Sequence, residues 1–211
     1  MTQSQGEVVV IAAPSGAGKT SLVKALIETS PNIDVAISHT TRPMRSHEMD
    51  GVNYHFVSAE DFLSLQSEGG FIESAEVFGN LYGTSRDAMT RIISQGKHLV
   101  LEIDYQGAAQ IRQQVQDAIS IFILPPSLAT LKERLHSRAQ DDAATIERRT
   151  GEAMNEISHY KEFDYLVVND VFDVALSQIR SIIECGEQAF SLKNQLAAQS
   201  TLLSELLTTS P

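Results

Sequence analysis

The chain has 211 residues, of which 42% are apolar, and its 16 basic and 27 acidic side chains give a formal net charge of −11. This length suits one α/β domain with a substantial core, and the acidic balance argues against nucleic-acid binding, because phosphate contacts need a basic face. The single cysteine excludes an intrachain disulfide. No apolar run approaches the ~18 residues of a membrane span. We therefore expect a cytoplasmic protein without membrane or nucleic-acid partners.

The first predicted element is an apolar strand, Val8–Ala12, and a helical pattern follows over residues 21–28. Between them lies a run of small residues that ends in a lysine and a threonine: Ala13, Pro14, Ser15, Gly16, Ala17, Gly18, Lys19 and Thr20. A strand, such a loop and a helix form the setting of a phosphate-binding loop, in which backbone N–H groups and the helix N-terminus surround an anion. Ala13 stands where the first glycine of the pattern is expected.

Two side chains of this loop have predicted roles. Lys19 is expected to reach the β- and γ-phosphates of a nucleoside triphosphate, and Thr20 to offer its hydroxyl to Mg²⁺. The loop by itself predicts nucleotide binding and leaves the reaction open.

Residues 38–88 are polar and rich in turns, with short alternating segments at 54–57 and 71–77, and Ser58 has the character of a helix N-cap. Arg42 and Arg45 lie three residues apart in an otherwise acidic chain, and two arginine forks suit a second phosphate group. The Glu73 carboxylate could accept two hydrogen bonds from the edge of guanine. From its spacing alone, however, we favour a solvated strand residue.

Further apolar strands are predicted at 98–103, Ile119–Leu124 and Tyr165–Val168, and they alternate with helical patterns at 106–115, 128–138 and 143–160. Strands of this kind that alternate with helices indicate a parallel sheet covered on both faces. Residues 136–150 are rich in charge and are interpreted as a lid. The tail at 190–211 carries Leu192, Leu196, Leu203 and Leu207 near helical spacing, which predicts a docked terminal helix or, as the alternative, a surface for a homo-oligomer.

Taken together, these motifs resemble the guanylate kinase family. The matching stretches run in family order at 13–21, 38–45, 51–56, 71–73, 76–80, 82–85, 102–107, 122–127 and 168–170. The resemblance implies one α/β domain with a P-loop NTPase-type parallel sheet core flanked by helices (about 1–37, 89–135 and 151–190), an inserted GMP-binding lobe (about 38–88), a lid (about 136–150) and a helical tail. It also implies transfer of the γ-phosphoryl group of ATP to GMP and dGMP, with Mg²⁺.

The resemblance also assigns roles by position, and with it base recognition by Glu73 outweighs the solvated interpretation. The implied GMP-binding residues are Ser38, Arg42, Arg45, Tyr54, Glu73, Tyr82, Thr84, Glu102 and Asp104. The implied catalytic residues are Lys19, Arg42, Asp104 and the arginines Arg134, Arg138 and Arg149. Asn169 joins the phosphate loop on the ATP side, and Asp104 assists Thr20 at the metal through water.

The chain departs from the usual family pattern at Leu81, His47, Glu102 and Ala139, which concerns the acceptor lobe and the lid. Two alternatives stay open: a related kinase with another phosphorylated acceptor, and a non-catalytic guanylate-kinase-like module that binds a protein partner. Intact Lys19 and Thr20 favour an enzyme, and Glu73, Tyr82 and Thr84 together favour a guanine acceptor.

Overall fold

The computed structural model describes residues 6–46, 48–77, 79–137 and 143–208. The chain divides into two compact units: Met1–Val10 with Ser30–Ala118, and Ile11–Thr29 with Ile119–Pro211. Strand β1 (Val8–Ala12) is fully buried and contributes residues to both units.

The first unit contains the parallel pair β2 (Ile33–Val35) and β7 (His98–Glu102), in which Ile33 lies opposite His98. In strand order β7 is followed by β1, and the amide of Leu99 donates to the carbonyl of Glu7 at 2.8 Å. Helices α3 (Arg86–Ser94) and α4 (Tyr105–Gln114) flank these strands in the sequence. Leu99, Val100 and Leu101 are buried, as a strand covered on both faces requires.

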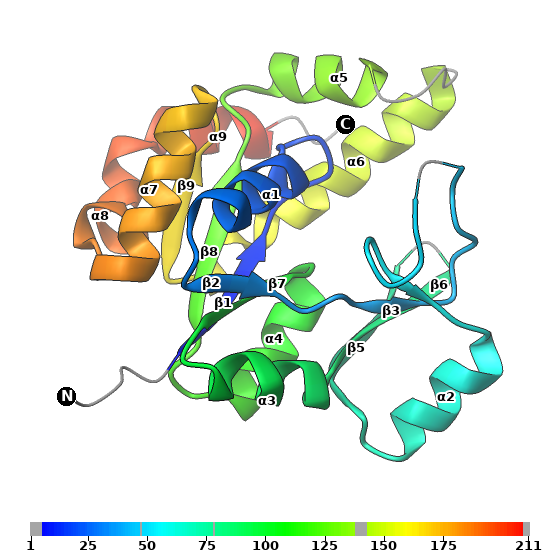
Figure 1. Cartoon of the computed structure of the whole chain (residues 1–211). Helices are drawn as coiled ribbons and strands as arrows, with labels where there is room; N and C mark the ends of the chain where they lie inside the picture. Colours follow the sequence, from blue (N-terminus) through cyan, green and yellow to red (C-terminus); the bar gives the residue numbers. More distant parts are fainter. Residues whose placement is uncertain (1–5, 47, 78, 138–142, 209–211) are drawn as a thin grey trace. The chain divides into compact units, whose positions relative to one another are not determined.

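A second sheet in this unit has the strand order β4-β3-β6-β5, and Figure 1 labels its strands β3, β5 and β6. Its strands are β3 (His39–Thr40), β4 (His55–Phe56), β5 (Phe71–Val77) and β6 (Asn80–Ser85), and helix α2 (Ala59–Ser67) follows β4. Ser58 caps α2, as predicted, because its hydroxyl accepts the amide N–H of Asp61 at 3.0 Å. The buried rings of Phe62 and Phe71 lie 4.5 Å apart and join α2 to the sheet.

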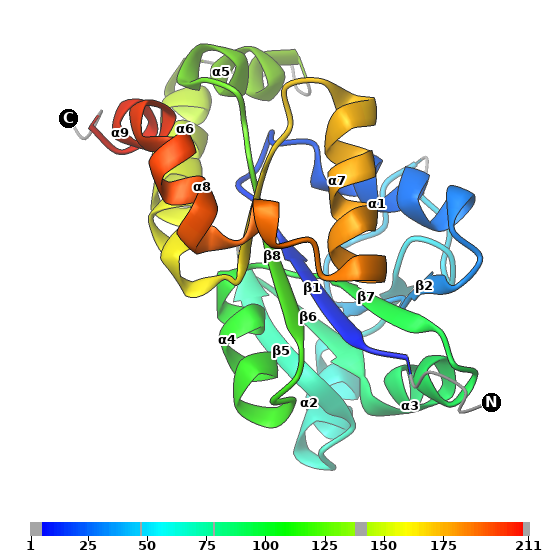
Figure 2. The same cartoon turned by 90° about the vertical axis from the view of Figure 1, so that its left-hand side faces the viewer.

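The second unit contains the parallel pair β8 (Ile119–Leu124) and β9 (Tyr165–Val168). Its helices are α1 (Lys19–Thr29), α5 (Leu128–Ser137), α6 (Ala143–Ser158), the 3-10 turn His159–Glu162 and α7 (Phe172–Cys185). Helices α1 and α7 lie side by side, as do α5 and α6 (Figures 1 and 2). The parallel strands flanked by helices are the fold class that the sequence predicted.

The tail differs from the single predicted stripe of leucines. After the 3-10 turn Gln188–Phe190, the chain forms two short helices, α8 (Leu192–Ala198) and α9 (Ser200–Thr208), which Figure 2 shows in succession. Helix α9 packs against α6, with Leu203 and Leu206 buried. Leu196 and Leu207 are exposed, so the docked interpretation applies to α9 and not to the whole stripe. Within the described ranges, no helix has the length and apolar character needed to span a bilayer.

Candidate functional site

The loop between β1 and α1 has the backbone that its sequence predicted. Gly16 and Gly18 have φ values of +90° and +93°, a region that L-residues with side chains rarely adopt. A Cβ at Gly16 would lie 3.0 Å from Leu131, and one at Gly18 would lie 2.5 Å from the side-chain nitrogen of Asn169. Glycine is therefore required at both positions, because of the backbone conformation and because of the close packing. The first position of the loop motif, in contrast, is occupied by the buried Ala13.

The carbonyl of Ala17 is an anchor of this loop. The buried side chain of Asn169, 4% exposed, donates to it at 2.7 Å, and Arg134 donates to it at 3.5 Å and to the carbonyl of Asn169 at 3.3 Å. The predicted residues Arg134 and Asn169 therefore both contact the loop backbone. Gly16, Gly18, Arg134 and Asn169 line a cavity of about 250 Å³.

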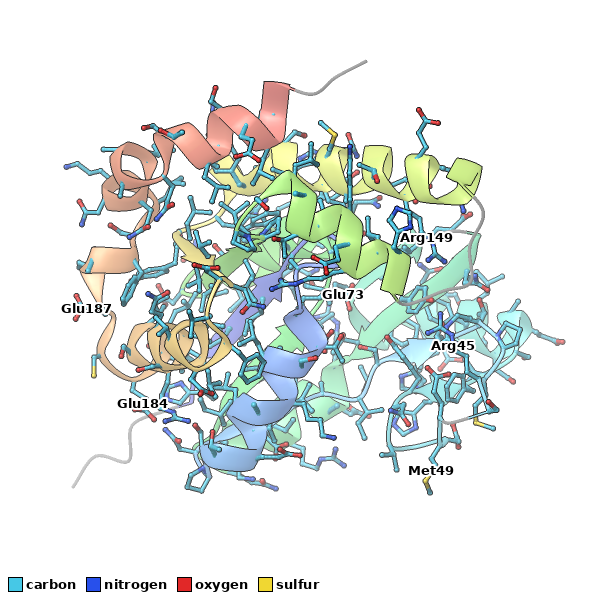
Figure 3. The ribbon with its side chains drawn as sticks, turned by 90° about the horizontal axis from the view of Figure 1, so that it is seen from above. Arg45, Met49, Glu73, Arg149, Glu184 and Glu187 are labelled. Carbon is cyan, nitrogen blue, oxygen red and sulfur yellow. The ribbon has the colours of Figure 1, made fainter. Side chains whose placement is uncertain are left out.

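Two residues that were not predicted from the sequence also lie around this loop. The half-exposed ring of Phe172 lines the same cavity, and the carboxylate of Glu156 on α6 accepts the amide N–H of Ser15 at 2.8 Å. Lys19 and Thr20 open α1, with Thr20 exposed. Arg149 lies on α6 (Figure 3). Arg138, predicted as a lid arginine, lies outside the described residues.

In the first unit, Glu73 of β5 faces Thr84 of β6 across the strand pair. The Thr84 hydroxyl donates to Glu73 Oε1 at 2.6 Å, and the hydroxyls of Ser38 and Thr84 are 3.3 Å apart. Glu73 is 3% exposed and Thr84 1% exposed. The interpretation of Glu73 as a solvated strand residue is therefore wrong, because the carboxylate is buried and hydrogen-bonded. Ser38, Glu73 and Thr84, which the sequence analysis assigned to GMP binding, thus lie next to one another.

Helix α4 holds the strand that carries Glu73. Gln110 exchanges two hydrogen bonds with the backbone of Ser74, at 3.0 and 2.7 Å, and Gln114 donates to the carbonyl of Ile72 at 2.7 Å. Strand β5 is at the edge of its sheet, so these amides satisfy backbone groups that would otherwise lack partners. No local pattern predicts this contact, because glutamines on a helix are usually solvated.

Arg42 makes a bidentate ion pair with Glu48, another residue that was not predicted from the sequence. Its two terminal nitrogens donate to the two carboxylate oxygens at 2.8 and 3.1 Å, and the backbone N–H of Arg45 donates to the same carboxylate at 2.8 Å. The hydrogen bonds from Arg42 hold the pKa of Glu48 at about 2, and this pairing raises the pKa of Arg42.

Aromatic side chains surround Arg42. The guanidinium carbon lies 5.5 Å from the ring centre of Tyr54 and 5.7 Å from that of Phe56. The rings of Tyr54 and Tyr82 are 5.9 Å apart. Burial raises the pKa of Tyr54, and the nearby charge of Glu102 at the end of β7 raises it further. Arg42, Tyr54, Tyr82 and Glu102 thus form one neighbourhood, while Arg45 is exposed on the loop between β3 and β4 (Figure 3).

Asp104 is the N-cap of α4. One of its carboxylate oxygens accepts the amide N–H of Gly107 at 2.9 Å, and the other accepts from the side chain of Gln106 at 3.2 Å. This local role explains an aspartate at the position. In the described part of the chain, no group of three His, Cys, Asp or Glu side chains is arranged to hold a metal ion.

The chain is similar to known proteins over nearly its whole length. A family model described as guanylate kinase matches residues 5–185. A guanylate kinase of Pseudomonas fluorescens (strain Pf0-1) is 51% identical over 98% of this chain and 100% of its own length. One from Vibrio cholerae is 50% identical over 96% and 98%. The crystal structure of guanylate kinase from Anaplasma phagocytophilum superposes with a TM-score of 0.71 at 34% identity, over 93% of this chain and 95% of that one.

Proposed function

The chain belongs to the guanylate kinase family, and we propose that it transfers the γ-phosphoryl group of ATP to GMP, and also to dGMP, giving ADP and GDP. The observation that carries the choice of acceptor is the buried pair of Glu73 and Thr84. A carboxylate held in this way can accept hydrogen bonds from the N1 and amino groups of guanine. Adenine has no such pair of donors.

The proposed ATP-binding residues belong to the second unit. The phosphate-binding loop at 13–20 receives the triphosphate, and Lys19 contacts the β- and γ-phosphates. Asn169, which lines a cavity together with Gly16 and Gly18 of this loop, is assigned to the ATP side. Transfer spreads negative charge over the equatorial oxygens of the γ-phosphoryl group, so fixed positive charges and N–H groups lower the barrier. We assign this stabilisation to Lys19, Arg134, Arg138 and Arg149.

The proposed GMP-binding residues belong to the first unit. Ser38, Glu73 and Thr84 read the base, and the phosphate-binding groups are Arg42, Arg45, Tyr54 and Tyr82. Glu102 and Asp104 complete this set, with Asp104 assisting catalysis. An acceptor phosphate is already ionised near neutral pH, so no protein base is required to activate it. Arg42 and Arg45 instead offset its charge, which would otherwise repel ATP.

Mg²⁺ is the proposed cofactor. The residues fit such an ion, because Thr20 is an exposed residue next to Lys19 at the start of α1, its side chain carries a hydroxyl oxygen, and Mg²⁺ takes oxygen ligands. The Asp104 carboxylate oxygens retain lone pairs beside their two hydrogen bonds and can accept from a metal-bound water. When bound, the ion neutralises phosphate charge.

The function is tested by offering AMP, CMP, UMP, GMP and dGMP with ATP and Mg²⁺ under identical conditions and measuring ADP formation. We expect GMP to be the best acceptor, with dGMP also used. No turnover with any acceptor would instead favour a non-catalytic binding module, and preference for an acceptor without guanine would favour a related kinase.

The assignment of Glu73 has its own test. Glu73→Gln replaces one carboxylate oxygen with a donor amide, which meets a donor group of guanine. We expect KM for GMP to rise by about tenfold or more, since hydrogen bonds to charged groups contribute about 1.5–3 kcal/mol, while KM for ATP changes little. Equal increases for both substrates would count against base recognition.

Three wider predictions complete the proposal. The substrates are intracellular nucleotides, which supports a cytoplasmic location. Residues 136–150 act as a lid that excludes water during transfer. Self-association into a homo-oligomer stays a prediction, with the exposed Leu196 and Leu207 as its candidate surface, and light scattering of the purified chain would test it.

A further inference from the structure

Glu48 binds three donors with one carboxylate. Oε1 accepts from Arg42 Nη2 at 2.8 Å, while Oε2 accepts from Arg42 Nη1 at 3.1 Å and from the backbone N–H of Arg45 at 2.8 Å. The side chains of Arg42 and Glu48 are only 14% and 8% exposed. This pair therefore differs from a solvated surface ion pair, which contributes little because water and salt screen it.

The rest of the guanidinium is also held. Nη1 of Arg42 donates to the carbonyl of Pro43 at 2.8 Å, and the rings of Tyr54 and Phe56 lie within 5.7 Å of the guanidinium carbon. An arginine side chain that is not held in this way samples many rotamers and loses that freedom when it binds a ligand. The contacts on Arg42 remove most of that freedom before any substrate binds.

We propose that Glu48 is a positioning residue for GMP, which acts by holding the guanidinium of Arg42 and the backbone of Arg45 in the geometry that receives the acceptor phosphate. The proposal rests on the proposed function. It assigns to Glu48 no contact with the substrate. Its effect is preorganisation: a phosphate meets an arginine fork that is already placed, so less ordering is needed on binding.

The geometry indicates that Glu48 holds Arg42 in place for the phosphate and does not compete with the phosphate for it. The hydrogen bonds of Arg42 to Pro43 and Glu48 use both hydrogens of Nη1 and one of Nη2. The remaining donors lie beside the Tyr82 side chain, which also hydrogen-bonds the guanidinium and is itself a proposed phosphate ligand, so a phosphate can bind there while Glu48 stays in place. A phosphate that displaced Glu48 would leave an almost buried carboxylate without its arginine partner, and would also break its bond to Arg45. Leaving a buried carboxylate without its partner in this way is strongly destabilising.

The test is Glu48→Gln, measured by steady-state kinetics with each substrate varied in turn. The amide has one acceptor oxygen for three donors, so at least one donor faces an NH₂ group. We expect KM for GMP to rise about tenfold, since hydrogen bonds to charged groups contribute about 1.5–3 kcal/mol, and KM for ATP to change less than twofold. The matched control is Glu60→Gln, an exposed glutamate in the first turn of α2, which should leave both constants unchanged.

A double-mutant cycle tests whether Glu48 acts through Arg42. In an Arg42→Ala background, Glu48→Gln should raise KM for GMP clearly less than it does in the wild-type background, because only the bond to the Arg45 backbone is left for Glu48 to hold. An undiminished effect in that background would overturn the proposal. A fall in KM for GMP in the single variant would do the same, because it would show that the carboxylate competes with the phosphate.

Thermal unfolding separates positioning from a loss of folding. If Glu48→Gln does not fold, Glu48→Asp keeps the charge while shortening the reach, and the same selective rise in KM for GMP is expected. A wild-type chain that does not phosphorylate GMP would refute the proposed function. A wild-type chain that does, with Glu48 variants that match it, would refute only the role of Glu48.

Discussion

Gly107 is the position where one added methyl group should disturb base recognition without removing any proposed ligand. It lies in the first turn of α4, and a Cβ there would be 2.9 Å from Oε2 of Glu73 and 3.2 Å from two side-chain atoms of Ile103. Ordinary contact begins at 3.4 Å, so the carboxylate would have to move by about half an ångström. Thr84 holds that carboxylate at 2.6 Å, which opposes the movement.

The stability of Gly107→Ala depends on two opposed effects. Alanine is favoured over glycine in a helix by about 1 kcal/mol, whereas overpacking a close site costs about 1–3 kcal/mol. The net loss is therefore about 0–2 kcal/mol. For a chain of this size that lowers the melting temperature by at most about 8 °C. The enzyme should remain folded under ordinary assay conditions.

The effect on GMP should be larger than the effect on folding. Because a misplacement of 1 Å can cost about 10²-fold, a shift of half that size should raise KM for GMP about tenfold. KM for ATP should stay within twofold. The measurement is steady-state kinetics with each substrate varied, alongside thermal unfolding. Gly151→Ala is the control, because a Cβ at this position in α6 meets nothing within 4 Å. An unchanged KM for GMP in Gly107→Ala would refute the reasoning.

Three further changes test other parts of the molecule. Gly18→Ala should raise KM for ATP at least about tenfold in the same assay, because φ is +93° and the new Cβ would lie 2.5 Å from Asn169, at a strain cost of about 1–3 kcal/mol. Hydrogen bonds from Arg42 lower the pKa of Glu48 from 4.5 to about 2. The pair therefore stabilises the fold above pH 4.5, and this contribution is lost as the pH falls toward 2. In urea unfolding, the free energy of unfolding of Glu48→Gln should accordingly fall less over that pH range than that of the wild type. Leu206→Ala removes a fully buried side chain of α9 and should lower the free energy of unfolding by about 2–5 kcal/mol, against less than about 1 kcal/mol for the exposed Leu207→Ala.

The elements with strong local patterns could be predicted from the sequence. The apolar runs of β1, β8 and β9 have the predicted bounds, and Ser58 caps α2 as expected. Such features depend on residues close in the chain. The helices of the tail were harder to predict, because four leucines at helical spacing do not reveal that the helix is interrupted at Gln199, between α8 and α9.

The partners of the site residues were not predictable from the same patterns. Glu73 could not be identified as buried, because its burial depends on Thr84 eleven positions later and on contacts from α4. Glu48 lies in a polar loop where a glutamate is ordinarily solvated, and only the fold of that loop brings it to Arg42. Residue types, and the order of the motifs along the chain, indicated which side chains belong to the candidate site. The hydrogen bonds that hold those side chains became visible only in the structure.

The two predicted residues around Ala17 illustrate how such a network prepares a site. The peptide between Ala17 and Gly18 is trans, as is every described peptide bond, so the N–H of Gly18 points opposite to the carbonyl of Ala17. Asn169 and Arg134 both bind that carbonyl and fix its direction. They therefore also fix the direction of the N–H, which faces away from Asn169. In this way Asn169 stabilises an anion-binding conformation of the loop through its backbone, and this role is compatible with a second one toward ATP.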